Sequence, residues 1–349
     1  MIARLQVQSC VWFTIREGMP DMNDLRAMEV TEHIDRLMTV DFHTRRFIID
    51  LYNATRAKMG GVPLTFKAAK TMLKSVEKGS TVAFLVGFPT FGTFVGEQDG
   101  PVGAAMLSRA LSELLDVKIV VMTDKAQSDM VKNVFAGAGF SVIGKIANSV
   151  SSRQIVVNGI EENKLLNTRR ILDELHPSAI ITIERPSRNM AEKYMSMNGI
   201  DLSSKVARLD DLIPAAMDAG ITTIGIADGG NEVGCGLIKG DVIKNHPNGE
   251  AIASNVSTDL LIFASISNLG AYGLAGAVSA ISSDLYILPD KETLERTLLT
   301  AANSGLHNGP PLWLDPGTDG IPCRLELFFW ECMGRMIWEE LNPHFPKFY

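Results

Sequence analysis

The chain has 349 residues, of which 46% are hydrophobic and 21% charged, a composition that excludes disorder and allows a large buried core. Its formal net charge is −7 and it has no long basic block, so small polar metabolites are more natural partners than nucleic acid. No apolar window of about 18 residues occurs, and we therefore expect no membrane-spanning helix.

The first residues, MIARLQVQSCVWFTIREGM, contain Arg4 and Arg16 and no acid before Glu17, which is typical of an organelle-targeting sequence. An ordinary N-terminal extension over residues 1–29 explains the same pattern. The four cysteines are scattered, without a C-x-x-C pair, which favours free thiols in a reducing compartment. We expect a cytoplasmic protein, with the mitochondrial matrix as the alternative.

Apolar runs of strand length then alternate with amphipathic segments of helix length. The runs suit buried parallel strands, and the alternation suits a sheet with helices on both faces. Helical patterns at about residues 23–60 and 323–341 flank this core, and no linker or repeat divides it. We expect one doubly wound α/β domain over residues 30–349, with a mostly parallel sheet and N- and C-terminal helical additions. The expected strands are 81–87, 117–123, 154–158, 179–184, 221–227 and 259–265, and the expected helices between them are 101–115, 126–137, 163–175, 208–219 and 270–282.

Polar, glycine-rich turns follow several of these runs. In a doubly wound sheet, ligands bind at the carboxyl ends of the strands, so the turns should converge on one crevice. Glycine allows the backbone to approach a ligand closely, and neighbouring carboxylates repel unless a cation or proton lies between them. The turns are FPTFGTFVGEQDGPVGAA (88–105), ERPSRN (184–189), DGGNEVGCG (228–236) and ISNLGAYGL (266–274).

The acids of the third turn are candidates for catalysis. If a helix begins at Gly229, then Asp228 and Glu232 face the same way, because residues four apart share a helix face. They could then share a magnesium or manganese ion, or one could stay protonated as a general acid. Asp99 and Asp319 are candidates to complete this cluster. The candidate metal ligands are Asp228, Glu232 and Asp319.

Helix capping is the alternative for the same turn. Asp228 would then be an N-cap, and Asn231 and Glu232 would bind first-turn amides. Capping does not require the run of glycines, and the run therefore favours a binding role that includes Gly229, Gly230 and Asn231.

The second turn carries two arginines. If it opens a helix, Arg185 and Arg188 can reach one side and hold a substrate carboxylate. A surface pair of arginines is the alternative. Glu184 is either a base for an amine or the partner that orients Arg185, and the spacing does not separate the two.

The fourth turn offers Asn268 and Tyr272 one helical turn apart, a donor and a phenol suited to orient a substrate, although its glycines also suit close helix packing. The segment AGAGF follows a helix and lacks a dinucleotide fingerprint, and neither G-x-S-x-G nor a P-loop occurs. Serine hydrolases and ATPases therefore lose support.

The motifs GFPT…EQDGPVGA, IERPSR…Y, ADGGNEVGCG, SNLGAYGL and PGTDGIP occur in order, with VDFHTRRFIIDLYNATRAKMGGVPLTFKAAK upstream. This set resembles the D-glutamate cyclase family, in its C-terminal domain, over about residues 30–341. The resemblance implies a reversible closure of D-glutamate to 5-oxo-D-proline with loss of water, in which Glu184, Asp228, Glu232 and Asp99 are the catalytic candidates. It implies a small anionic amino acid as partner and no certain cofactor, and it leaves a divalent metal and a homo-oligomer open.

One departure keeps other functions open. Two-domain relatives carry a further large N-terminal domain for which 349 residues leave no room. The alternatives are a hydrolase or lyase acting on another lactam or amino acid, and a non-catalytic module that holds a nucleotide or metabolite phosphate in its glycine turns.

Overall fold

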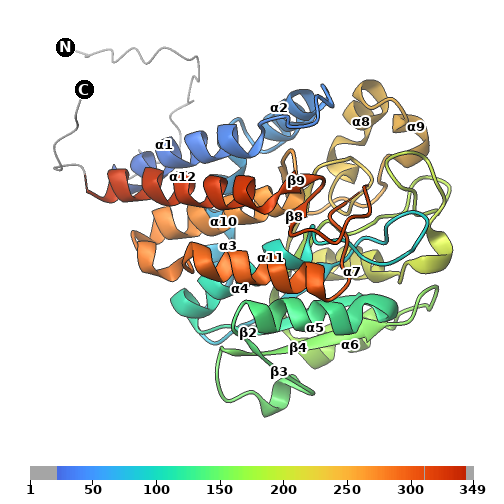
Figure 1. Cartoon of the computed structure of the whole chain (residues 1–349), viewed down its shortest axis with the longest axis horizontal. Coiled ribbons are helices and arrows are strands. Elements are labelled where there is room, and N and C mark those ends of the chain that lie inside the picture. The colour runs from blue at the N-terminus through green and yellow to red at the C-terminus, as the bar shows by residue number, and fades with distance from the viewer. Residues whose placement is uncertain (1–21, 310, 343–349) are drawn as a thin grey trace.

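A computed structural model describes residues 22–309 and 311–342 of the chain (Figure 1). The targeting-like segment and most of the expected extension lie outside the described residues. Residues 22–29 begin helix α1 (Met22–Met38), so the domain boundary expected at residue 30 falls inside a helix.

The described residues form one central sheet of parallel strands. Its members are β1 (Thr81–Val86), β2 (Lys118–Asp124), β3 (Ser141–Ile143), β4 (Gln154–Ile160), β5 (Pro177–Ile183), β6 (Thr222–Ala227) and β7 (Leu260–Phe263). The spatial order is β3-β4-β2-β1-β5-β6-β7, and every neighbouring pair is parallel. The expected doubly wound α/β fold is confirmed, and each expected strand is present. A short antiparallel pair, β8 (Gly317–Thr318) and β9 (Ile321–Pro322), lies outside this sheet.

Helices cover both faces of the sheet. They are α2 (Ile48–Lys58), α3 (Leu64–Ser75), α4 (Pro101–Leu115), α5 (Ser128–Gly137), α6 (Thr168–Leu175), α7 (Leu212–Asp218), α8 (Lys239–Asn245), α9 (Gly249–Ile252), α10 (Ser267–Ser282), α11 (Lys291–Asn303) and α12 (Cys323–Leu341). The strand period of two separates the faces: Val82 and Phe84 join the core under α1, α4, α10 and α12, whereas Ala83 and Leu85 pack toward α6 and α7.

The terminal helices are part of the main core. In Figure 1 α1, α10 and α12 lie side by side, and these three helices contact one another. From α12, Phe329, Trp330 and Met333 are buried in the same cluster as the sheet residues. Among the described helices, none combines the length and the apolar character needed to cross a membrane.

The strand order places a crevice at the centre of the sheet. From β1 the chain proceeds to β2 and β4 on one side, whereas β5, β6 and β7 extend on the other. The helix connections therefore diverge between β1 and β5. In folds of this kind, ligands bind outside the carboxyl ends of the strands at this switch point.

Candidate active site

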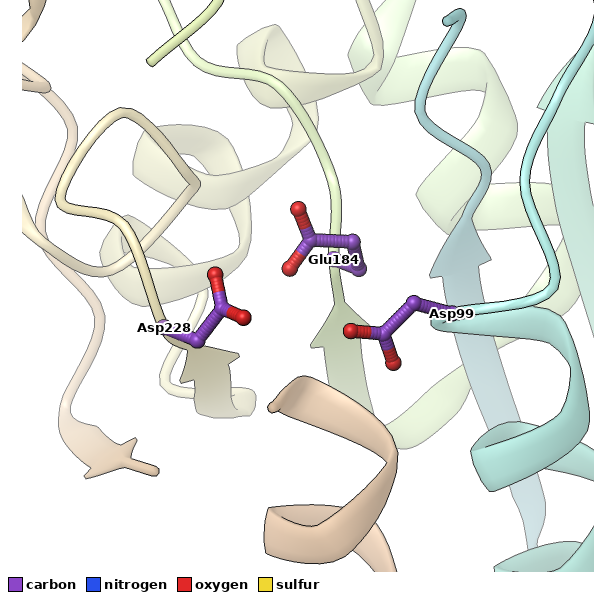
Figure 2. Close-up of side chains that lie close together, drawn as sticks. All are labelled: Asp99, Glu184 and Asp228. Carbon is purple, nitrogen blue, oxygen red and sulfur yellow. The ribbon is translucent and has the colours of Figure 1, made fainter. Parts of the chain in front are cut away.

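Three carboxylates from three different turns meet at this crevice. Asp99 lies just before α4 in the turn after β1, Glu184 directly follows β5, and Asp228 directly follows β6. One oxygen of each lies within 4.8 Å of an oxygen of each of the others. Figure 2 shows the three side chains pointing toward one another. Parallel strands end at the same edge, and this explains why residues so far apart in the sequence come together.

The backbone holds Glu184 in an unusual conformation. Its φ is +46°, in the left-handed region that a glutamate rarely adopts. Gly100 allows the neighbouring turn to touch this point, because a Cβ atom there would lie 2.6 Å from the carbonyl oxygen of Ile183. The Ser267 hydroxyl donates to Glu184 Oε2 over 2.6 Å. The carboxylate is thus fixed by its own backbone and by the first residue of α10.

Two helices that meet here cap each other. Asp99 accepts from the amides of Ser267 and Asn268, at the start of α10, over 3.1 and 2.6 Å. In return, Asn268 Oδ1 accepts from the amides of Gly100 and Gly103, at the start of α4, over 2.9 and 2.8 Å. The positive ends of both helix dipoles therefore lie beside the carboxylates. Asn268, expected to bind substrate, has its side-chain oxygen occupied by this cap.

Tyr272 lies one turn further along α10, inside the core. Its hydroxyl donates to Glu326 over 2.7 Å, and its ring packs edge-on against Trp330 at 5.4 Å between centroids. The structure does not bring Tyr272 to the three carboxylates by any hydrogen bond.

Arg45 joins two acids across the crevice. It donates to Asp228 Oδ2 over 3.0 Å and to Asp319 Oδ2 over 2.5 Å. Asp41 accepts from the backbone amide of Arg45 and holds its loop in place. Sequence reasoning missed Arg45, because nothing in the sequence distinguishes it from its neighbour Arg46.

No helix begins at Gly229 in the turn after β6, so the condition under which Asp228 and Glu232 would share a helix face is not met. Glu232 folds back on this turn and accepts from the amides of Gly229 and Gly230 over 2.9 and 2.7 Å. The Asn231 amide donates to the Met195 carbonyl oxygen. Glu232 thus holds the shape of the turn by binding its amides, as the capping alternative predicts, although no helix follows. Asn231 ties the turn to the segment that contains Met195.

Burial and mutual repulsion govern the charges of the cluster. Burial raises the pKa of Glu184 well above its usual range, and the charges of Asp228, Glu232 and Asp99 raise it further. Burial also raises the pKa of Asp99 and of Asp228, although Arg45 opposes the shift at Asp228. Buried acids therefore outnumber the one arginine bonded to them here, and they need a proton, a metal ion or a cationic ligand between them.

The donor set suits a divalent cation. Asp99, Glu184 and Asp228 offer carboxylate oxygens close enough together for a magnesium or manganese ion, both of which prefer oxygen ligands. The metal set expected from the sequence differs, because Glu232 binds backbone amides and Asp319 binds Arg45. Of that set, only Asp228 belongs to the group that the geometry assembles.

The two arginines of the ERPSRN turn bind protein carboxylates. The turn opens no helix, so the condition under which both arginines would reach one side is not met. Arg185 is completely buried and donates to both oxygens of Asp124 over 2.6 and 2.8 Å. Arg188 pairs with Asp210 and Asp211 over 2.8 and 2.6 Å. The structure therefore does not bring these guanidinium groups together as a clamp at the carboxylate cluster.

Sequence reasoning also missed Glu97 and Ser267. Glu97 lies in the motif EQDG and Ser267 in the motif SNLG, but the neighbouring Asp99 and Asn268 were the residues selected from these motifs. Glu97 is 7% exposed and its pKa is raised by burial and by the charges of Asp319 and Asp99.

Two comparisons with known proteins agree with each other. A family model described as D-glutamate cyclase-like, C-terminal, matches residues 53–327. The chain is also similar to a human protein named "D-glutamate cyclase, mitochondrial", with 28% identity over 248 residues, which cover 68% of this chain and 38% of the human protein. The chain thus spans less than half of that relative. The matched range includes Asp99, Glu184 and Asp228, whereas Arg45 lies before it.

Proposed function

Since this chain belongs to the D-glutamate cyclase-like family, we propose that it converts D-glutamate to 5-oxo-D-proline and water. The observation that carries the proposal is the meeting of three buried carboxylates at the switch point of the sheet. The human relative named for this reaction is much longer, so the proposal is that residues of the present chain suffice for the chemistry.

The reaction moves two protons without net gain or loss. The α-nitrogen forms a bond to the carbon of the γ-carboxyl group, and the bond from that carbon to one of its two oxygens breaks. The ammonium group loses two protons, and the leaving oxygen takes both to depart as water. The site therefore needs one group that accepts a proton from nitrogen and one that gives a proton to oxygen.

The partners of the carboxylates suggest how these roles divide. The ion pair with Arg45 favours the ionised form of Asp228, so we assign to it the proton taken from nitrogen. Glu184 has no bonded cation and is repelled by the charges of Asp228 and Asp99, which favours a protonated form that can donate to the leaving oxygen. This assignment makes Glu184 an acid, whereas the sequence left it as a base or as a partner of Arg185.

Asp99 and the helix ends complete the site in this proposal. Asp99 keeps its hydrogen bonds from the first amides of α10 and presents a fixed negative charge to the substrate. A divalent ion bound to the three carboxylates would polarise the γ-carboxyl group. Asp99 and Asp228 are 1% exposed and Glu184 is 6% exposed, so the covering turns have to move when substrate enters.

A chiral assay tests the proposal. Purified protein is incubated with D-glutamate or L-glutamate, with and without EDTA, and 5-oxoproline is resolved by chiral chromatography. We expect product from the D-enantiomer alone and the reverse reaction from 5-oxo-D-proline. Folded protein that produces nothing in either direction, with or without added manganese, would contradict the proposal. Thermal protection by nucleotides instead of D-glutamate would favour the binding-module alternative.

A further inference from the structure

Glu97 is a buried acid without a protein partner. The residue is 7% exposed, its carboxylate oxygens keep some contact with solvent, and no donor among the described residues forms a hydrogen bond to them. The other acids of the region each have a donor: Asp99 has backbone amides, Glu184 has Ser267, Asp228 and Asp319 share Arg45, Glu232 has backbone amides and Glu326 has Tyr272. Glu97 differs from these acids in that neither of its carboxylate oxygens has a donor among the described residues.

The backbone fixes this side chain in place. The Glu97 amide donates to the Phe88 carbonyl oxygen over 3.2 Å. On either side of Glu97, the His307 amide donates to the Gly96 carbonyl oxygen over 3.0 Å, and the Gln98 amide donates to the His307 carbonyl oxygen over 2.8 Å. Gly96 is needed for this close approach, because a Cβ atom there would lie 2.2 Å from Gln127 Oε1. The backbone of Glu97 is thus fixed on both sides.

The charge of Glu97 interacts with the charges of the carboxylate cluster. Its electrostatic neighbours are Asp319, Asp99 and Glu232, which repel it, and Arg45, which attracts it. It repels Glu184 in turn. Glu97 lies outside the three-oxygen group that suits a metal ion, so it borders that group without being one of its close members.

A carboxylate with no protein donor leaves its acceptor oxygens available to a ligand that supplies N–H groups. Resting on the proposed function, we propose that Glu97 binds the α-ammonium group of the amino-acid substrate. That group is the one cation of D-glutamate, and its three N–H donors suit a carboxylate with unused acceptors. The residue then selects amino acids over dicarboxylates that lack the amine.

The test combines two ligands with two variants. Binding of D-glutamate and of glutarate, which has both carboxylates and no amine, is measured by calorimetry in wild type and in Glu97→Gln. We expect Glu97→Gln to weaken D-glutamate about 10- to 100-fold, because a charge-assisted hydrogen bond is lost. Glutarate affinity should stay the same or improve, since a negative charge is removed. Glu113→Gln, at the far end of α4, makes the same chemical change beside Arg109 and Arg153 and should alter neither affinity.

Several outcomes overturn the inference. Equal losses for both ligands would make Glu97 structural, and loss of manganese binding with normal D-glutamate affinity would make it a metal residue. If Glu97→Gln does not fold, Glu97→Asp keeps the charge and should discriminate between the ligands less than wild type does. Wild type that binds neither ligand would remove both proposals.

The two proposals fail separately. Wild type that binds D-glutamate through Glu97 but forms no 5-oxoproline refutes the proposed reaction and leaves the inference standing. Product formation together with unchanged ligand discrimination in Glu97→Gln refutes the inference and leaves the reaction standing.

Discussion

Successive residues at the end of β5 lead into two different buried environments. Arg185 enters a region where its guanidinium binds both oxygens of Asp124 and the carbonyl oxygens of Gly87 and Ala207. Glu184 enters a region where buried acids lie close together and Arg45 is the bonded cation. The first region pairs each charge with an opposite charge inside the protein. The second leaves negative charge to be neutralised from outside.

The difference indicates which region stabilises the fold and which binds a ligand. A paired buried charge is strongly destabilising only when one partner is removed. Like charges held together cost stability in the folded protein and persist where binding or catalysis requires them. Substitutions in the two regions should therefore change different quantities.

The largest effect is expected for Arg185→Met. It leaves the Asp124 carboxylate buried without its cation, and we expect the free energy of unfolding to fall by about 3–5 kcal/mol. Chemical denaturation measures this loss. A KM for D-glutamate that rises steeply while stability stays normal would instead return Arg185 to a substrate-binding role.

Asp228→Asn and Glu184→Gln should show the opposite pattern. Each keeps the shape of the side chain and removes its charge or proton, so kcat should fall about 10²-fold or more. For Glu184→Gln the melting temperature should stay the same or rise, because repulsion inside the cluster decreases. For Asp228→Asn this gain is opposed by the loss of the ion pair with Arg45, which keeps its second partner Asp319. Variants that melt lower but turn over normally would show that these carboxylates are scaffolding.

The pH dependence of stability should reveal Glu326. Burial raises its pKa from 4.5 to about 7, and the hydrogen bond from Tyr272 opposes part of that shift. The folded protein therefore holds a proton that the unfolded chain releases between about pH 4.5 and pH 7. Its contribution to stability is complete below this window and is lost as the pH rises through it, by at most about 1.4 kcal/mol per pH unit.

Denaturation of wild type and Glu326→Gln across this window isolates the contribution. The variant should show a flatter pH dependence than wild type, because the amide does not titrate. If stability changes with pH in the same way in both proteins, the pKa of Glu326 in the folded protein is not raised.

The smallest effect is expected for Tyr272→Phe. It removes one buried hydrogen bond to Glu326 and keeps the ring packing, so stability should fall by about 1 kcal/mol. We expect kcat and KM for D-glutamate to stay within about twofold of wild type. A tenfold fall in kcat without loss of stability would place Tyr272 in the site as the sequence suggested.

Much of the fold could be predicted from the sequence because buried parallel strands appear as continuous apolar runs. The run at residues 81–87 became β1, and the helix expected at 101–115 has the same bounds in α4, with Pro101 at its first turn. The strand β3 was missed because it has three residues at the edge of the sheet and no buried run. Local patterns thus determined the elements wherever burial is extensive.

The sequence by itself also determined that the turns bearing Asp99, Glu184 and Asp228 would meet, since the carboxyl ends of parallel strands share an edge. Only the tertiary structure decided where the side chains of irregular turns point. It directed Arg185 to Asp124, folded Glu232 onto its own turn, and brought Arg45 to Asp228 across 183 residues of sequence. Such contacts depend on packing between distant segments, and no local periodicity records them.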